Sequence, residues 1–312
     1  MDTSTGTTTQ SLTQLMMPSS DEIARGRRKL HRKAALIAIL AVTSYVGLVV
    51  THVGFLLQVM FAAVLVVASV ATATSVMHDG NTNVVGFDTD IDQMPFARLA
   101  PQQPWKPWHR YQHLYMWVLY GFLTLQWFVL SDYATLVHRK VGSHSLPMTP
   151  RKRDVALILF GKLLHLGWAI VLPMMFHPWW GVLGFYLVMS WSVGFLLANI
   201  FQLAHCVDCA EFFTPDAPRR GSDFELHQLR TTVDIRCRVP VVRGFVHWLM
   251  GGLDHQIEHH LAPKLPHTTY RIAAPKLQAA CAERGVDYRV HPSVTAAVMS
   301  HARWLRQMGR QP

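Results

Sequence analysis

Three histidines stand close together in residues 251–260, which read Gly-Gly-Leu-Asp-His-Gln-Ile-Glu-His-His. His259 and His260 follow Gln256 at helical spacing, so the three side chains can share one side of a helical turn that His255 precedes. Neutral imidazole is a ligand for iron, copper and zinc. The segment therefore predicts a metal site. The alternative left open by this segment alone is a polar helix start whose histidines hold no ion.

Two further histidines stand where long apolar segments end. His78, followed by Asp79, comes after the apolar residues 34–77, and His205 ends a second apolar stretch. Segments that leave a membrane on the same side bring their terminal residues to one face, where the histidines of residues 251–260 can join them. His78 and His205 are therefore expected to supply partners for these histidines in one metal site.

The remaining histidines and the cysteines have simpler interpretations. The histidines in polar or basic stretches are expected to be solvated, and these are His31, His138, His144, His291 and His301. His52 and His177 fall in turns between apolar segments, and His165 is expected to be a buried, hydrogen-bonded residue of a helix.

The four cysteines show no disulfide-framework spacing and are expected to be reduced. Cys206 and Cys209 form a C-x-x-C, which indicates either two packed thiols or a redox or metal pair.

The composition indicates a membrane protein. Of the 312 residues, 50% are hydrophobic and 15% are charged, and the apolar residues fall in blocks long enough for spans of about 20 residues. The blocks at 34–77 and 155–204 each contain a turn, so each is expected to form a hairpin of two helices. The Lys and Arg residues that give the net charge of +10 lie almost wholly outside these blocks, where the positive-inside rule places them. The basic charge is therefore explained by the membrane, and no nucleic-acid partner is expected.

The topology depends on the shorter apolar run at residues 114–130. If it spans the membrane, the basic residues 151–153 face the outside; if it lies in the interface, every basic cluster stays on the cytosolic side. Its dense Trp and Tyr content also favours the interface, although a tilted short span is the alternative. We therefore expect an all-α integral membrane fold, with four transmembrane helices in two hairpins and a cytosolic helical cap that carries the histidine site.

The expected division of the chain follows from these blocks. It comprises a disordered basic cytosolic tail without a signal peptide (1–33), hairpin 1 (34–77), a cytosolic or interfacial segment (78–153), hairpin 2 (154–205) and the cytosolic cap (206–312). Within the cap, residues 275–282 and 293–308 are expected to form amphipathic helices.

The segment GGLDHQIEHHLAPKLPHTTY resembles the third histidine box of the membrane fatty acid desaturases, in its acyl-lipid or front-end form. FQLAHCVDCAEF is similar to the end of the family's fourth helix, and TDIDQMPFARLAPQQPWKPWHRYQHLYMWVLYGF is similar to the segment after its second box. The resemblance implies an oxidoreductase that desaturates a long acyl lipid or acyl thioester, uses oxygen and two histidine-bound irons, and takes electrons from a separate ferredoxin or small cytochrome. It implies iron ligands at His78, His205, His259 and His260. It also makes Gln256, His255 and Asp79 candidates for ligands or neighbours of ligands.

One region departs from the family. Residues 78–86 read His-Asp-Gly-Asn-Thr-Asn-Val-Val-Gly, so the start of the first box runs directly into residues that normally follow the second box. An internal segment is therefore inferred to be missing at Asn81–Thr82, and with it several iron ligands. His109 and His113 are interpreted as structural, with replacement of the lost ligands as the alternative. We expect at most one iron and impaired desaturation; the alternatives are a non-catalytic desaturase-like protein that binds lipid or a partner, and a lipid hydroxylase.

Overall fold

The computed structural model describes residues 10–51, 53–77, 94–131, 133, 137, 140–141, 144–145, 151–213, 222–237 and 239–311. His52, His78, Asp79, His138 and the Asn81–Thr82 junction lie outside these residues, so the predictions that concern them are not tested by the structure. The described chain is mostly helical, in agreement with the predicted fold class.

The helices, in chain order, are α1 (Leu12–Met16), α2 (Ser20–Val49), α3 (Phe55–Thr72), η1 (Ala73–Met77), η3 (Pro107–Tyr111), α5 (Gln112–Leu119), η4 (Tyr120–Phe122), α6 (Leu123–Gln126), η5 (Trp127–Ser131), α8 (Lys152–Leu166), η6 (Gly167–Val171), α9 (Leu172–Met174), α10 (Trp179–His205), α11 (Ser222–Thr231), α12 (Pro240–Leu249), α13 (Gln256–Leu261), η7 (His267–Thr269), α14 (Tyr270–Glu283) and α15 (Val294–Met308). The strands are β1 (Lys140–Val141), β2 (His144–Ser145), β3 (Asp234–Ile235) and β4 (Val290–His291), which pair as antiparallel β1–β2 and parallel β3–β4.

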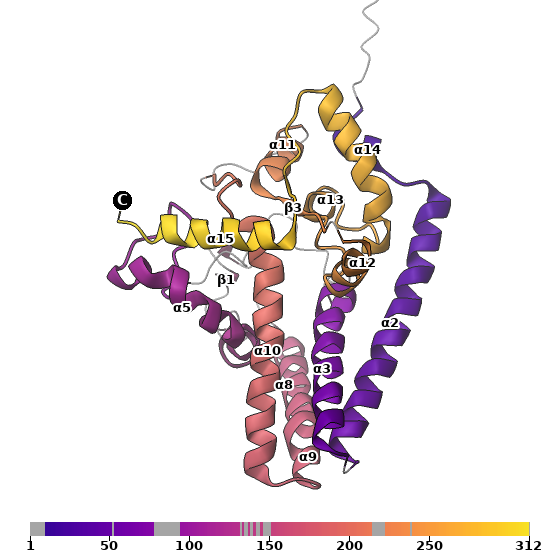
Figure 1. The fold of residues 1–312 in the computed structure, drawn as a ribbon, viewed down its shortest axis with the longest axis vertical. Coiled ribbons are helices and arrows are strands. Elements are labelled where there is room, and N and C mark those ends of the chain that lie inside the picture. Colours follow the sequence, from indigo (N-terminus) through magenta and orange to yellow (C-terminus); the bar gives the residue numbers. More distant parts are fainter. Residues whose placement is uncertain are drawn as a thin grey trace, which may run out of the picture.

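The long apolar helices form two hairpins. α2 packs against α3, and α8 continues through η6 and α9 to a turn at His177 and Pro178, from which α10 returns. The His177 ring donates from Nε2 to the carbonyls of Leu48 and Val49, at 3.1 and 3.0 Å, and so joins the turns of the two hairpins. α3 also packs against α10, and Figure 1 shows α2, α3, α8 and α10 running roughly side by side below the cap.

Five helical segments in the described residues are long and apolar enough to cross a membrane, whereas the sequence predicted four. They are Ser20–Val49, Phe55–Val76, Pro107–Ser131, Lys152–Met174 and Trp179–His205. The additional segment, Pro107–Ser131, is built from short 3-10, α and π pieces rather than one regular helix. In Figure 1 it runs obliquely from the edge of the molecule towards α10, unlike the other four.

The N-terminal part of the chain is more ordered than predicted. Residues up to 33 were expected to form a disordered tail, but α1 and the first half of α2 are helical. Serines provide the physical reason, because Ser11 and Ser19 cap these helices and each exchanges hydrogen bonds with the residue three positions on. The backbone N–H groups of Leu12 and Thr13 also donate to the Glu225 carboxylate, at 3.0 and 2.9 Å. α1 is thereby fixed to the cap.

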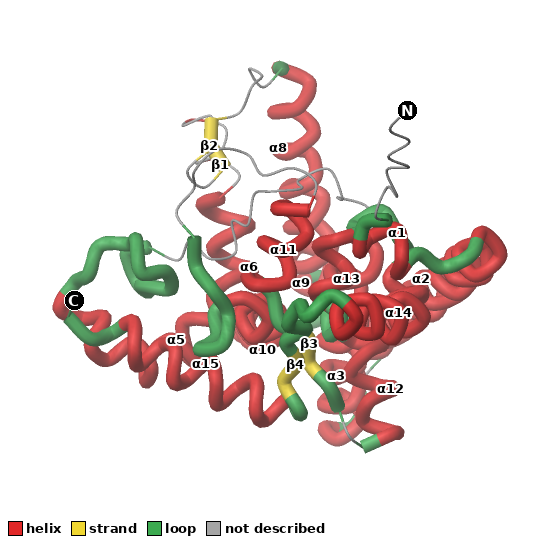
Figure 2. Tube along the Cα trace, turned by 90° about the horizontal axis from the view of Figure 1, so that it is seen from above, coloured by secondary structure: helices red, strands yellow, loops and turns green. Residues whose placement is uncertain are grey.

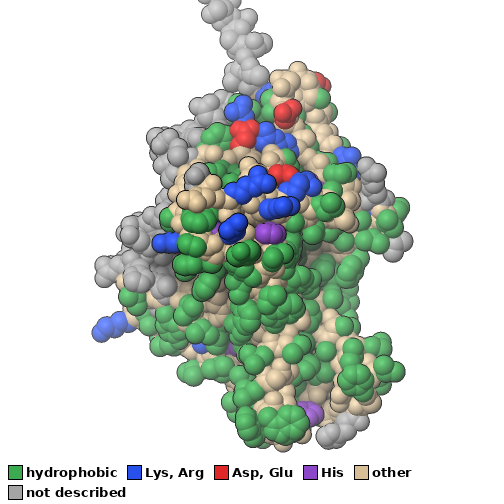
Figure 3. Space-filling model, turned by 60° about the vertical axis from the view of Figure 1, so that its left-hand side comes forward, with side chains coloured by type: hydrophobic (Ala, Val, Ile, Leu, Met, Phe, Trp, Pro, Cys, Tyr) green, Lys and Arg blue, Asp and Glu red, His purple; other side chains and the backbone are tan. Residues whose placement is uncertain are grey.

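The cap is formed by α11–α15 and the β3–β4 pair. Figure 2 shows α15 running alongside α5 on one side of the molecule, and α1 lying next to α14 on the other. The predicted amphipathic segments 275–282 and 293–308 lie in α14 and α15. On the face shown in Figure 3, Lys and Arg gather on the cap, while the surface below them is mainly hydrophobic. This distribution is that of a membrane protein with a polar end.

A glycine turn connects α12 to α13. Gly251 and Gly252 have φ of +60° and +78°, a conformation that glycine adopts without strain. A Cβ atom at Gly251 would lie 2.3 Å from the carbonyl oxygen of Thr74 in η1. The absence of a side chain therefore allows the turn before α13 to touch the end of the first hairpin.

Candidate metal centre

The structure brings His205 and the paired histidines of α13 together. His205 is the last residue of α10 and is 5% exposed, and its ring centroid lies 4.9 Å from that of His260. The rings of His259 and His260 are 5.6 Å apart. Residues separated by more than fifty positions in the sequence therefore share one site at the membrane end of the cap.

The Gln256 side chain lies between two of these rings. Its Nε2 is 2.9 Å from Nε2 of His205 and 3.3 Å from Nε2 of His260. Because an amide nitrogen only donates, both imidazoles accept there and turn an Nε2 lone pair towards the same place. The buried Oε1 of Gln256 has no hydrogen-bond partner in the described part of the chain. An ion in place of the amide nitrogen would meet both lone pairs, and a turn of the Gln256 amide would add its oxygen as a third donor.

The Nδ1 atoms of His259 and His260 form hydrogen bonds with residues of two neighbouring helices. His260 donates from Nδ1 to Oε1 of Gln228 on α11, at 2.7 Å, and this bond fixes the tautomer whose Nε2 lone pair faces the site. His259 Nδ1 lies 3.0 Å from the hydroxyl of Tyr270, at the start of α14. α11 and α14 therefore orient the two histidines of α13.

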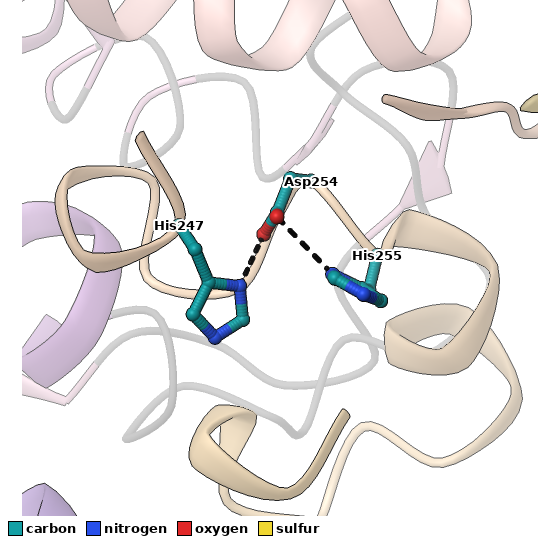
Figure 4. Close-up of side chains that lie close together, drawn as sticks. All are labelled: His247, Asp254 and His255. Atoms are coloured by element: carbon teal, nitrogen blue, oxygen red, sulfur yellow. Dashed lines mark hydrogen bonds and ion pairs between the residues drawn. The ribbon is translucent and has the colours of Figure 1, made fainter. Parts of the chain in front are cut away.

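A second cluster lies directly before α13, as Figure 4 shows. His247, on α12, donates from Nδ1 to Oδ1 of Asp254 at 2.7 Å, and Nδ1 of His255 lies 3.2 Å from Oδ2 of the same carboxylate. Burial opposes the charge of His255, but the Asp254 carboxylate outweighs it and raises the pKa of His255 to about 9. Burial likewise opposes the charge of Asp254, whereas His255 and His247 hold the pKa of that carboxyl well below its usual value.

Two buried acids lie beneath the third box. Burial and the neighbouring Asp234 carboxyl raise the pKa of Glu258 well above its usual value, and burial raises the pKa of Asp234. The Tyr288 hydroxyl is 2.8 Å from Oε1 of Glu258 and also contacts Oδ2 of Asp234. Asp234 Oδ1 accepts the N–H of Ile257 at 3.0 Å, so β3 is fixed to the first turn of α13.

Comparisons with known proteins decide the family. A sequence profile described as "Fatty acid desaturase" matches residues 76–292, which is more than half of the chain. The chain belongs to the fatty acid desaturase family. Proteins named sn-1 linoleoyl-lipid 6-desaturase, from Arthrospira platensis and a Synechocystis strain, are 31% and 34% identical to it over 76% and 75% of this chain. A protein named acyl-lipid (8-3)-desaturase, from Physcomitrium patens, is 33% identical over 74% of this chain.

The chain spans 64% and 65% of the length of the two cyanobacterial desaturases and 48% of that of the Physcomitrium protein. No solved structure matches it.

The desaturase family implies iron, and the residues at the end of α10 fit such an ion in their chemistry. His205 and His260 supply imidazole lone pairs that converge, and His259 adjoins them on the same helix. Gln256 adds an oxygen donor in a buried place. Of the four residues predicted as ligands, the structure brings His205 and His260 together and places His259 beside His260, whereas His78 lies outside the described residues.

Several predictions about individual histidines need correction. His291 and His301 were expected to be solvated because polar residues surround them in the sequence, but both are buried. His301 accepts from the Tyr120 hydroxyl at 2.7 Å and donates to the carbonyl of Cys206 at 2.6 Å, so it joins α15 to the residue after His205. Burial lowers the pKa of His301 to about 4, which keeps the ring neutral.

The sequence also contains His109, His113 and His165, and the contacts of His109 and His165 in the described residues are with other side chains and backbone groups. His109 is fully buried and bonds the nitrogen of Lys106 and the carbonyl of Pro95. His113 follows it on α5, and His165 contacts the Tyr186 hydroxyl at 3.1 Å within the membrane helices. His247 and Gln228 were not predicted from the sequence. The spacing from His247 to Asp254 crosses a turn, and Gln228 lies on another helix, so no local pattern marks either residue.

Proposed function

We propose that this chain is an oxygen-dependent oxidoreductase that introduces a double bond into a long acyl chain through histidine-bound iron. The observation that carries the proposal is the convergence of the His205 and His260 Nε2 lone pairs at the membrane end of the cap. The names of the relatives, which describe acyl-lipid desaturases, support an acyl lipid as the substrate. An acyl thioester is the other substrate that fits.

Iron, when bound, supplies the oxidising power to remove hydrogen from two unactivated methylenes, which no acidic or basic side chain can do. The residues of this chain bind and orient. His205, His259 and His260 are proposed as ligands together with His78, and Gln256 as a ligand or a neighbour of one. Gln228 and Tyr270 hold the rings of His260 and His259. His255 and Asp79 are proposed to neighbour the ligands.

A cavity among the membrane helices is proposed to hold part of the acyl chain. Its volume is about 530 Å³, and Leu65, Leu125, Phe185 and Val193 are among its lining residues. Val193 precedes His205 by twelve residues of α10, a rise of about 18 Å. Apolar side chains surround a hydrophobic ligand in such sites. The cavity therefore suits the methyl-terminal part of a long chain better than the carbons nearest the metal centre.

The cap is proposed to lie on the cytosolic side, with Pro107–Ser131 in the interface and the remaining four long helices as spans. The gathering of Lys and Arg on the cap and the oblique course of Pro107–Ser131 support this topology. Electrons are proposed to come from a separate protein, either a ferredoxin or a small cytochrome.

The sequence at residues 78–86 limits the proposed activity. We expect at most one iron per chain and weak desaturation, because the histidines of the second box are missing from that segment. The same observation favours a second candidate, a non-catalytic desaturase-like protein that binds lipid.

The test is the iron content of the full chain purified in detergent, together with the masses of acyl products formed with a reduced ferredoxin. A content near one iron with a product two mass units lighter supports the proposal. A content near two that the H247Q change does not lower shows that other residues complete a di-iron site, which refutes the expected loss. Iron near zero without product favours the lipid-binding candidate, and a product sixteen units heavier identifies a hydroxylase.

A further inference from the structure

The cluster of His247, Asp254 and His255 lies outside the proposed iron ligands. One ligand atom from each of its residues lies within 4.8 Å of the other two, which makes it a group of potential metal ligands among the described residues. We propose that this cluster is a second metal site, which binds one divalent transition-metal ion of the zinc and iron(II) class.

The distances within the cluster fit a coordination shell. His247 Nδ1 is 2.7 Å from Oδ1 of Asp254, and His255 Nδ1 is 3.2 Å from Oδ2. Ligands held at about 2.1 Å from an ion lie about 3 Å from one another, so small side-chain shifts would place an ion among these atoms. Figure 4 shows both rings turning a nitrogen towards the carboxylate between them. Two imidazoles and one carboxylate with open positions are a ligand set typical of iron(II) and zinc.

The burial of the cluster points to a ligand. The Asp254 side chain is 5% exposed, and the buried Nδ1 of His255 has no partner with hydrogen-bond geometry in the described residues. A buried polar atom that lacks such a partner costs free energy, and an ion would satisfy it. The His247 and His255 side chains are 12% and 19% exposed, so water can reach the remaining coordination positions.

The surrounding charges also suit a cation. Asp254 supplies a negative charge in contact with both imidazoles. Arg271 places a positive charge near His247, which would repel a bound cation. The ion takes the place of the protons on the two Nδ1 atoms: a neutral ring moves its proton to Nε2, and a doubly protonated ring releases one proton to the solvent.

An ion at this place would connect two elements of the cap. His247 lies on α12, and Asp254 and His255 lie after the Gly251–Gly252 turn, where His255 precedes the first residue of α13. α13 carries His259 and His260. The second ion would therefore fix the start of the helix that bears two proposed iron ligands.

The experiment measures zinc bound to the metal-stripped full chain in detergent micelles, by equilibrium dialysis followed by elemental analysis. The H259Q/H260Q double variant removes two proposed iron ligands, so that binding at the second site is seen separately. H247Q is then added to this double variant. H31Q, at an exposed histidine of α2, is the matched control.

We expect the double variant to retain about one zinc and the H31Q change to leave that zinc in place. Adding H247Q should weaken this binding about tenfold or more, because a direct ligand contributes at least as much as the outer partners of metal ligands do. If H247Q impairs folding, D254N replaces it, since asparagine keeps the shape of the side chain. The visible absorption of bound cobalt(II) in the double variant gives a further measurement.

A double variant that binds neither zinc nor cobalt overturns the proposal and leaves an ion-paired His–Asp–His cluster. Zinc binding unchanged by H247Q and by D254N also overturns it. Failure of the proposed iron site would be seen separately, as wild-type protein that binds no more metal than the H259Q/H260Q variant.

Discussion

Replacing Gln228 by leucine tests whether α11 positions the metal ligand His260. Gln228 is 8% exposed, and its Oε1 accepts the Nδ1–H of His260 at 2.7 Å. Without this acceptor the ring can turn or change tautomer, and the Nε2 lone pair is then no longer held towards His205. Loss of such an outer partner weakens metal binding about 10- to 100-fold, which corresponds to about 1.4 to 2.7 kcal/mol.

The assay is competition between the protein and a chelator for iron(II) under anaerobic conditions. Gln228→Glu keeps an acceptor at the same place and is expected to bind at least as tightly as wild type. Gln307→Leu, at an exposed position of α15, is the control for the loss of an amide. A folded Gln228→Leu protein whose affinity stays within about twofold of wild type would refute the positioning role, given an expected loss of about tenfold or more.

Three further predictions follow from the contacts of the cap and the membrane helices. Gly251→Ala should lower the unfolding temperature much more than Gly285→Ala. Both glycines have positive φ, but only a Cβ atom at Gly251 would overlap Thr74. Equal decreases in the temperature of thermal unfolding would contradict this prediction. The folded state holds the His301 pKa near 4, below the unfolded value, so its contribution to stability is present above about pH 6.5 and is lost as the pH falls to about 4. This loss amounts to about 3 kcal/mol, and His301→Gln should remove that part of the pH dependence in unfolding titrations. Val193→Trp should narrow the cavity and weaken the binding of long acyl chains relative to short ones, and equal binding of both in a fluorescent-lipid displacement assay would argue against the proposed chain site.

The cap shows where local sequence was informative and where it was not. The amphipathic patterns in α14 and α15 and the third histidine box were visible because a helical turn brings residues three and four positions apart onto one side. His301 was wrongly expected to be solvated, because its polar neighbours in the sequence do not reveal that Tyr120 and Cys206 cover it. The order of residues 11–33 was missed because it depends partly on Glu225, some two hundred positions away.

The sequence alone determined that this chain has long apolar helices, a basic polar part and a histidine box of the desaturase type, since these properties depend on composition and short spacing. Only the tertiary structure decided that Gln256 lies between His205 and His260, that Gln228 orients His260, and that His247 joins Asp254 and His255. Each of these contacts joins different elements. Their formation depends on how helices pack and where the Gly251–Gly252 turn directs the chain, which local periodicity does not encode.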